Sequence, residues 1–103
     1  MFQDGVEIKV TISNDLAELI PTYLSNKEKE QQKIASLAEE DDFAAIKVIA
    51  HGIKGSGGGY GFADLTEIGR KIEEAAKNSD KAAIQEWNQQ LKIYLGNLKI
   101  DYA

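Results

Sequence analysis

The chain has 103 residues, of which 43% are hydrophobic, and its formal net charge is −5 at pH 7. This length suits one domain with a single core, and the acidic balance argues against nucleic-acid binding, which needs a basic surface. Because the chain has no cysteine and only one histidine, disulfides, thiolate metal sites and histidine-rich metal sites are excluded.

Residues 1–5 have neither the basic region nor the apolar region of a secretory signal. No run of apolar residues in the sequence approaches the roughly 20 that are needed to span a bilayer. We therefore expect a cytoplasmic protein with no membrane partner.

Both ends of the chain show the alternation of apolar and polar residues that is typical of strands. It covers residues 6–12 and residues 98–102. In an up-and-down bundle the first helix begins where the last one ends, so these two ends would be neighbours. A short two-strand pairing between them is our hypothesis for an otherwise extended N-terminal arm (residues 1–13) and a C-terminal tail (residues 99–103).

The first helix is predicted over residues 15–39. Ser13, Asn14 and Asp15 offer side chains that can cap its N-terminus, and Glu18 follows Asp15 at the spacing of a capping box. Pro21 lacks a backbone N–H, so it either kinks this helix or starts a fresh turn.

Three further amphipathic segments follow. Asp41 or Asp42 caps the second helix, which ends either near Ser56 or beyond the glycines at 57–59. The third helix starts at Phe62, residues 78–80 form a turn, and the fourth helix covers residues 81–97. The predicted fold is all-α: an antiparallel up-and-down four-helix bundle over residues 14–98 with an extended N-terminal arm.

The stretch from residue 50 to residue 62 stands apart from the rest. It contains the only histidine, His51, a lysine three residues later, Lys54, and six of the nine glycines. In a helix His51, Lys54, Gly55 and Gly58 share one face. Each interior glycine disfavours a helix by about 1 kcal/mol relative to alanine. One explanation for keeping them is access, because missing side chains let another protein approach the imidazole closely.

The pattern His51-x-x-Lys54-Gly55-Ser56, followed by Gly61, Leu65 and the pair Ile72-Glu73, resembles the histidine-containing phosphotransfer (Hpt) domain family. The resemblance extends loosely from about residue 14 to residue 98. It implies a phosphorelay protein of two-component signalling that accepts a phosphoryl group on His51 from a receiver-domain aspartate or a sensor histidine kinase. The group would then pass to another receiver aspartate.

The resemblance also implies roles for the surrounding residues. Nε2 of His51 would be the phosphorylated atom, and the Lys54 ammonium would stabilise the phosphoryl group. We expect the partner to be bound by the His51 face of the second helix, namely Lys47, Ala50, Gly55 and Gly58. The chain would be a carrier without a cofactor of its own and not an enzyme, because the Mg²⁺ and the catalytic apparatus belong to the receiver domain.

Two other functions remain open at this stage. A helical adaptor could bind receiver domains or kinases without accepting phosphate. A dimerisation and histidine-acceptor fragment of a kinase would have to be a dimer, and it usually carries a His-Glu dipeptide, whereas Gly52 follows His51 here. We expect a monomer.

Overall fold

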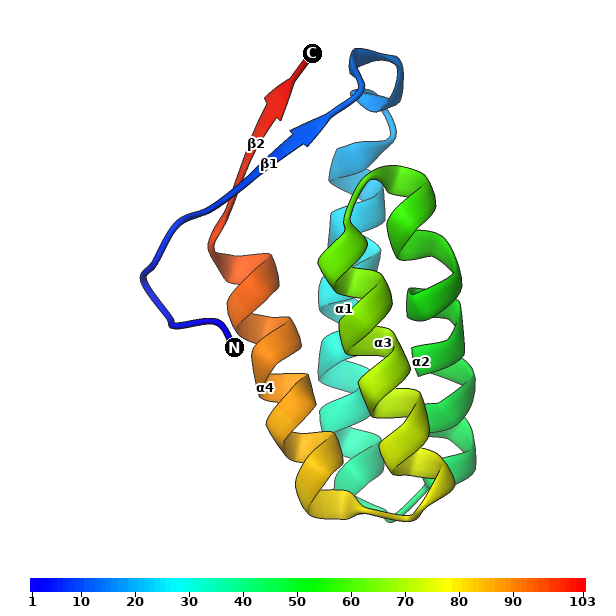
Figure 1. Cartoon of the computed structure of the whole chain (residues 1–103). Helices are drawn as coiled ribbons and strands as arrows, with labels where there is room; N and C mark the ends of the chain where they lie inside the picture. Colours follow the sequence, from blue (N-terminus) through cyan, green and yellow to red (C-terminus); the bar gives the residue numbers. More distant parts are fainter.

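The computed structural model describes all 103 residues and contains four α-helices that lie side by side (Figure 1). They are α1 (Ile20–Glu39), α2 (Phe43–Gly57), α3 (Ala63–Lys77) and α4 (Lys81–Gly96). The predicted bundle of four helices is confirmed. None of these helices combines the length and the apolar character that crossing a membrane requires.

Short connections join the helices at the two ends of the bundle. The α1–α2 and α3–α4 turns lie together at the lower end in Figure 1, and the α2–α3 connection lies at the upper end. Asp42 caps α2 by accepting a hydrogen bond from the Ala45 N–H at 3.2 Å, so of the two predicted caps it is Asp42 that serves. Asp80 caps α4 in the same way, through the Ala83 N–H at 3.1 Å.

The predicted start of the first helix was wrong. The residues expected to cap it close a separate 3₁₀ turn at Asn14–Leu16, where Ser13 Oγ accepts from the Asp15 N–H at 3.3 Å. Helix α1 begins only at Ile20, with Pro21 in its first turn. Proline suits this position because its fixed φ matches the helix and its missing N–H would have no partner there. Pro21 therefore starts the helix and does not kink it.

The two ends of the chain form a small parallel sheet, as hypothesised from their alternation. Strand β1 (Ile8–Ile12) pairs with β2 (Leu98–Tyr102), and Ile8 lies opposite Leu98. The sheet lies beside the upper end of the bundle (Figure 1). Residues 98–102, which we had divided between the bundle and a tail, thus form one strand, and the all-α description needs this sheet added.

Helices α2 and α3 approach each other closely at two glycines. A Cβ on Gly69 would lie 2.6 Å from the Lys54 backbone nitrogen, and one on Gly57 would lie 2.8 Å from the Thr66 nitrogen. Real Cβ atoms do not approach backbone so closely, so a larger residue at either position would force the two helices apart. Helix α2 ends at Gly57, one residue after Ser56, and a 3₁₀ turn at Gly58–Tyr60 follows it directly, so the glycines at 57–59 are helical residues and do not form a loop.

Candidate functional site

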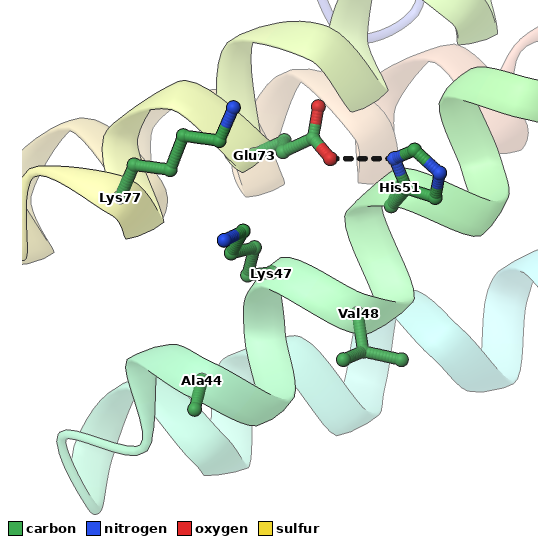
Figure 2. A pocket seen from close by; sticks show the side chains of 6 residues that line it. All are labelled: Ala44, Lys47, Val48, His51, Glu73 and Lys77. Atoms are coloured by element: carbon green, nitrogen blue, oxygen red, sulfur yellow. Dashed lines mark hydrogen bonds and ion pairs between the residues drawn. The ribbon is translucent and has the colours of Figure 1, made fainter.

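The imidazole of His51 lies on the outer face of α2, and its side chain is 68% exposed. Its Nδ1 atom lies 2.7 Å from Oε2 of Glu73, which projects from α3 (Figure 2). Lys54, one turn after His51 on α2, donates from Nζ to the other oxygen of the same carboxylate at 2.6 Å. Glu73 therefore connects both predicted site residues of α2, His51 and Lys54, to α3.

The Glu73 carboxylate is held in its ionised form. The hydrogen bond from Lys54, with a smaller contribution from His51, lowers the pKa of Glu73 below its ordinary value, although burial acts in the opposite direction. An ionised carboxylate can only accept hydrogen bonds, so we assign the proton of the neutral imidazole to Nδ1. The Nε2 atom then carries a lone pair and no proton.

A depression of about 630 Å³ lies beside the imidazole. We call it the His51 pocket; it is lined by Ala44, Lys47, Val48, His51, Glu73 and Lys77 (Figure 2). Val48 contributes an apolar side chain that is 73% exposed. Lys47 comes from α2 and Lys77 from α3. Because the only acid of the pocket, Glu73, is already bonded to Lys54, the pocket is locally cationic in a protein whose net charge is −5.

Comparison with models of known protein families identifies the family of this chain. The model of the family described as Hpt domain matches residues 18–100, which is most of the chain. The chain belongs to the Hpt domain family. Membership confirms the resemblance seen in the sequence and associates the chain with histidine phosphotransfer in phosphorelays. No curated protein and no solved structure gives a significant match.

Of the residues that we predicted to bind the partner of this Hpt domain, three lie on the surface and one is buried. Lys47 lines the His51 pocket. Gly55 and Gly58 are exposed, and a Cβ on Gly55 would meet no atom within 4 Å. Ala50, however, is fully buried, so its predicted place on the partner-binding surface was wrong. Successive helical residues point about 100° apart, so the residue before the exposed His51 can face the core, as Ala50 does.

Three residues of the site were not identified from the sequence. Glu73 was recognised only as part of the family pattern, because nothing local indicates that α3 brings it to His51. Lys77 follows Glu73 by one helical turn and shares its face for that reason. Val48 could have been found, since it lies three residues before His51 on the same helix face.

Proposed function

We propose that this Hpt domain is a phosphoryl carrier in which Nε2 of His51 accepts the group from a receiver aspartate or a histidine kinase and passes it to another receiver aspartate. The observation that carries the proposal is the contact between His51 Nδ1 and Glu73 Oε2 at 2.7 Å. It occupies one ring nitrogen and leaves the other with a lone pair on a side chain that is 68% exposed.

The transfer from an aspartyl phosphate balances without an added base. The Nε2 lone pair attacks phosphorus, a nitrogen–phosphorus bond forms, and the bond between phosphorus and the carboxylate oxygen breaks. Its electron pair leaves with the aspartate of the receiver. The ring keeps its proton on Nδ1 and becomes cationic, and the ionised Glu73 stabilises this positive charge across 2.7 Å.

We propose that Lys54, which bonds the second oxygen of the Glu73 carboxylate, stabilises the phosphoryl group. Its ammonium is 2.6 Å from the carboxylate and its side chain is 32% exposed, so it is only partly withdrawn from solvent. A phosphoryl group on His51 brings about two negative charges close to this ammonium and competes with Glu73 for it. We propose that Lys54 shifts toward the phosphoryl oxygens and stabilises the phosphorylated form.

The partner is proposed to dock on the His51 pocket and the adjoining glycines. Val48 supplies an exposed apolar contact, and Lys47 and Lys77 supply positive charge. A receiver domain presents acidic side chains and a bound Mg²⁺ around its aspartate, so the cations of the pocket match the acidic edge of such a partner. The Mg²⁺ of the reaction belongs to the receiver in this scheme.

The proposal is tested by mixing the protein with a receiver domain that carries a radiolabelled aspartyl phosphate, in the presence of Mg²⁺. We expect an acid-labile, base-stable label on the wild type and none on His51→Gln, with circular dichroism showing that both are folded. Gly58→Trp should be folded but labelled more slowly, since the indole would obstruct the approach of the receiver. Absence of label across several receivers and kinases would contradict the proposal.

The same mixture separates the remaining alternatives. Binding of a receiver without label on His51 would favour the helical adaptor. Light scattering distinguishes a carrier, which we propose to be a monomer, from a kinase-type fragment, which must be a dimer.

A further inference from the structure

The hydroxyl of Thr66, near the start of α3, joins two backbone groups at the end of α2. Thr66 Oγ1 accepts a hydrogen bond from the Gly58 N–H at 2.9 Å and donates one to the Lys54 carbonyl at 3.1 Å. In a regular α-helix the N–H of residue 58 would donate directly to the carbonyl of residue 54. The Thr66 hydroxyl therefore bridges the donor and acceptor of the last turn of α2.

This turn needs support from outside the helix. Its glycines disfavour the helical conformation by about 1 kcal/mol each relative to alanine. No residue within the turn carries a side chain that bonds the Lys54 carbonyl, and α3 supplies one instead. The contact is close because Gly57 has no Cβ to keep the Thr66 backbone away.

The bridge acts on a residue of the phosphotransfer site. Lys54 is fixed by α3 at three points: its carbonyl bonds Thr66, its Nζ bonds Glu73, and its backbone nitrogen lies against Gly69. Thr66 itself makes no hydrogen bond with His51 and does not line the His51 pocket. Its other bond, with the N–H of Gly58, lies on the proposed docking surface and bears on receiver binding, whereas its influence on the transfer rate at saturating receiver passes through Lys54.

We propose that Thr66 is a positioning residue for phosphoryl transfer, which holds the Lys54 turn in register with Glu73 through its hydroxyl bridge. The inference rests on the proposed function and assigns a chemical task to a side chain outside the family pattern described above. Valine has the shape of threonine but neither donates nor accepts, so Thr66→Val removes the bridge alone. Serine keeps the hydroxyl.

The first test compares the rate of label transfer to His51 at saturating receiver. We expect a loss of about tenfold for Thr66→Val, since displacements of 1 Å at a reacting site cost up to about 100-fold. Thr66→Ser should transfer at the wild-type rate. As a matched control, Ser36→Ala removes another hydroxyl that donates to a helix carbonyl, that of Gln32 in α1, and should transfer at the wild-type rate.

A double-mutant cycle then separates positioning from general structure. In the Lys54→Ala background, Thr66→Val should cause almost no further loss, because the side chain through which Thr66 acts is already gone. Wild-type rates for Thr66→Val, or losses that multiply in the double variant, would overturn the proposal. So would a Thr66→Ser protein as slow as Thr66→Val.

The bridge can also be measured without any phosphate. Gly58 is exposed, yet its amide hydrogen should exchange slowly in the wild type and in Thr66→Ser. In Thr66→Val it should exchange at least about tenfold faster while the buried Ile53 amide, in the interior of α2, keeps its rate. Equal Gly58 rates in all three proteins would overturn the bridge. Absence of label on the wild type would instead refute the carrier function, so the two failures are distinguishable.

Discussion

His51 and Glu73 lie on neighbouring helices with Nδ1 of the ring 2.7 Å from Oε2 of the carboxylate. The side chain of Glu73 is 8% exposed and that of His51 is 68% exposed, so the contact joins a buried anion to a surface imidazole. This arrangement fixes the orientation of the ring and the nitrogen that carries its proton. It also places a negative charge where the ring would become positive in the proposed phosphoryl transfer.

Glu73→Gln should slow phosphorylation of His51 by about 10- to 100-fold, the loss typical when a group that orients a metal-binding histidine is removed. The amide keeps the size of the side chain but has no charge, and its NH₂ group is a donor, so it cannot replace both carboxylate oxygens that bond Nδ1 of His51 and Nζ of Lys54. The measurement is single-turnover label transfer. Glu74→Gln is the control, because Glu74 is exposed on the same helix and bonds only Arg70. Equal rates for both variants would contradict the assigned role.

The lowered pKa of Glu73 should also appear in the pH dependence of folding. A carboxylate whose pKa is lower in the folded than in the unfolded protein stabilises the fold above its unfolded pKa, about 4.3, and loses that contribution as the pH falls further. The free energy of unfolding of the wild type should therefore fall more steeply below about pH 4.3 than that of Glu73→Gln. Urea titrations from pH 7 to about pH 3 measure the difference.

The difference between the pH curves of the wild type and Glu73→Gln reports the contribution of Glu73 alone, without that of the other acids. Glu67 also has a lowered pKa, through its hydrogen bond with Arg70, but it is present in both proteins and cancels in the difference. Parallel pH curves for the wild type and Glu73→Gln would show that the carboxylate adds nothing to stability in its ionised form.

Much of the fold was predictable because its signals are local. The four amphipathic segments have helical spacing, and Asp42 and Asp80 are capping residues followed directly by helices. The start of α1 was missed for a physical reason. Ser13 makes its capping bond to the N–H of residue 15 in a 3₁₀ turn, and residue types alone do not tell such a turn from the first turn of a helix.

Only the part of the site that lies on α2 was predictable from the sequence. His51 and Lys54 are three residues apart, and helical geometry places them together from sequence alone. Their connection through Glu73 depends on how α3 packs, which is a tertiary relationship. Ala50 was misplaced because one residue of sequence corresponds to about 100° around the helix, so a neighbour of an exposed residue is often buried.

Val48 should be the most sensitive apolar residue of the docking surface, since it is 73% exposed beside His51. Val48→Asp should raise the receiver concentration for half-maximal transfer by about tenfold or more, the effect of losing about 1.4 kcal/mol at an interface. The rate at saturating receiver should change little. Leu19→Asp is the control, because Leu19 is another exposed apolar side chain, on the segment before α1. A control as impaired as Val48→Asp would argue against specific docking.

The cations of the His51 pocket should make transfer sensitive to salt. Lys77→Glu reverses one charge of the pocket lining and should slow the association of an acidic receiver at low ionic strength. Raising the salt concentration should reduce the difference between this variant and the wild type. Lys92→Glu makes the same change in the groove between α1 and α4 and should have a smaller effect. A salt-independent rate would contradict the electrostatic part of the docking scheme.

Two glycines of the α2–α3 region should respond in opposite directions to alanine. At Gly69 the added Cβ would lie 2.6 Å from the Lys54 nitrogen and 3.0 Å from the Ala50 carbonyl oxygen, so the helices must separate. We expect Gly69→Ala to destabilise the fold by about 1–3 kcal/mol. Gly55→Ala meets nothing within 4 Å and should stabilise the fold by up to about 1 kcal/mol, because alanine favours the helix. Denaturant titrations decide both. Tolerance of Gly69→Ala would mean that α2 and α3 do not pack so closely at Lys54, and destabilisation by Gly55→Ala would mean that the face of α2 at Gly55 is not open.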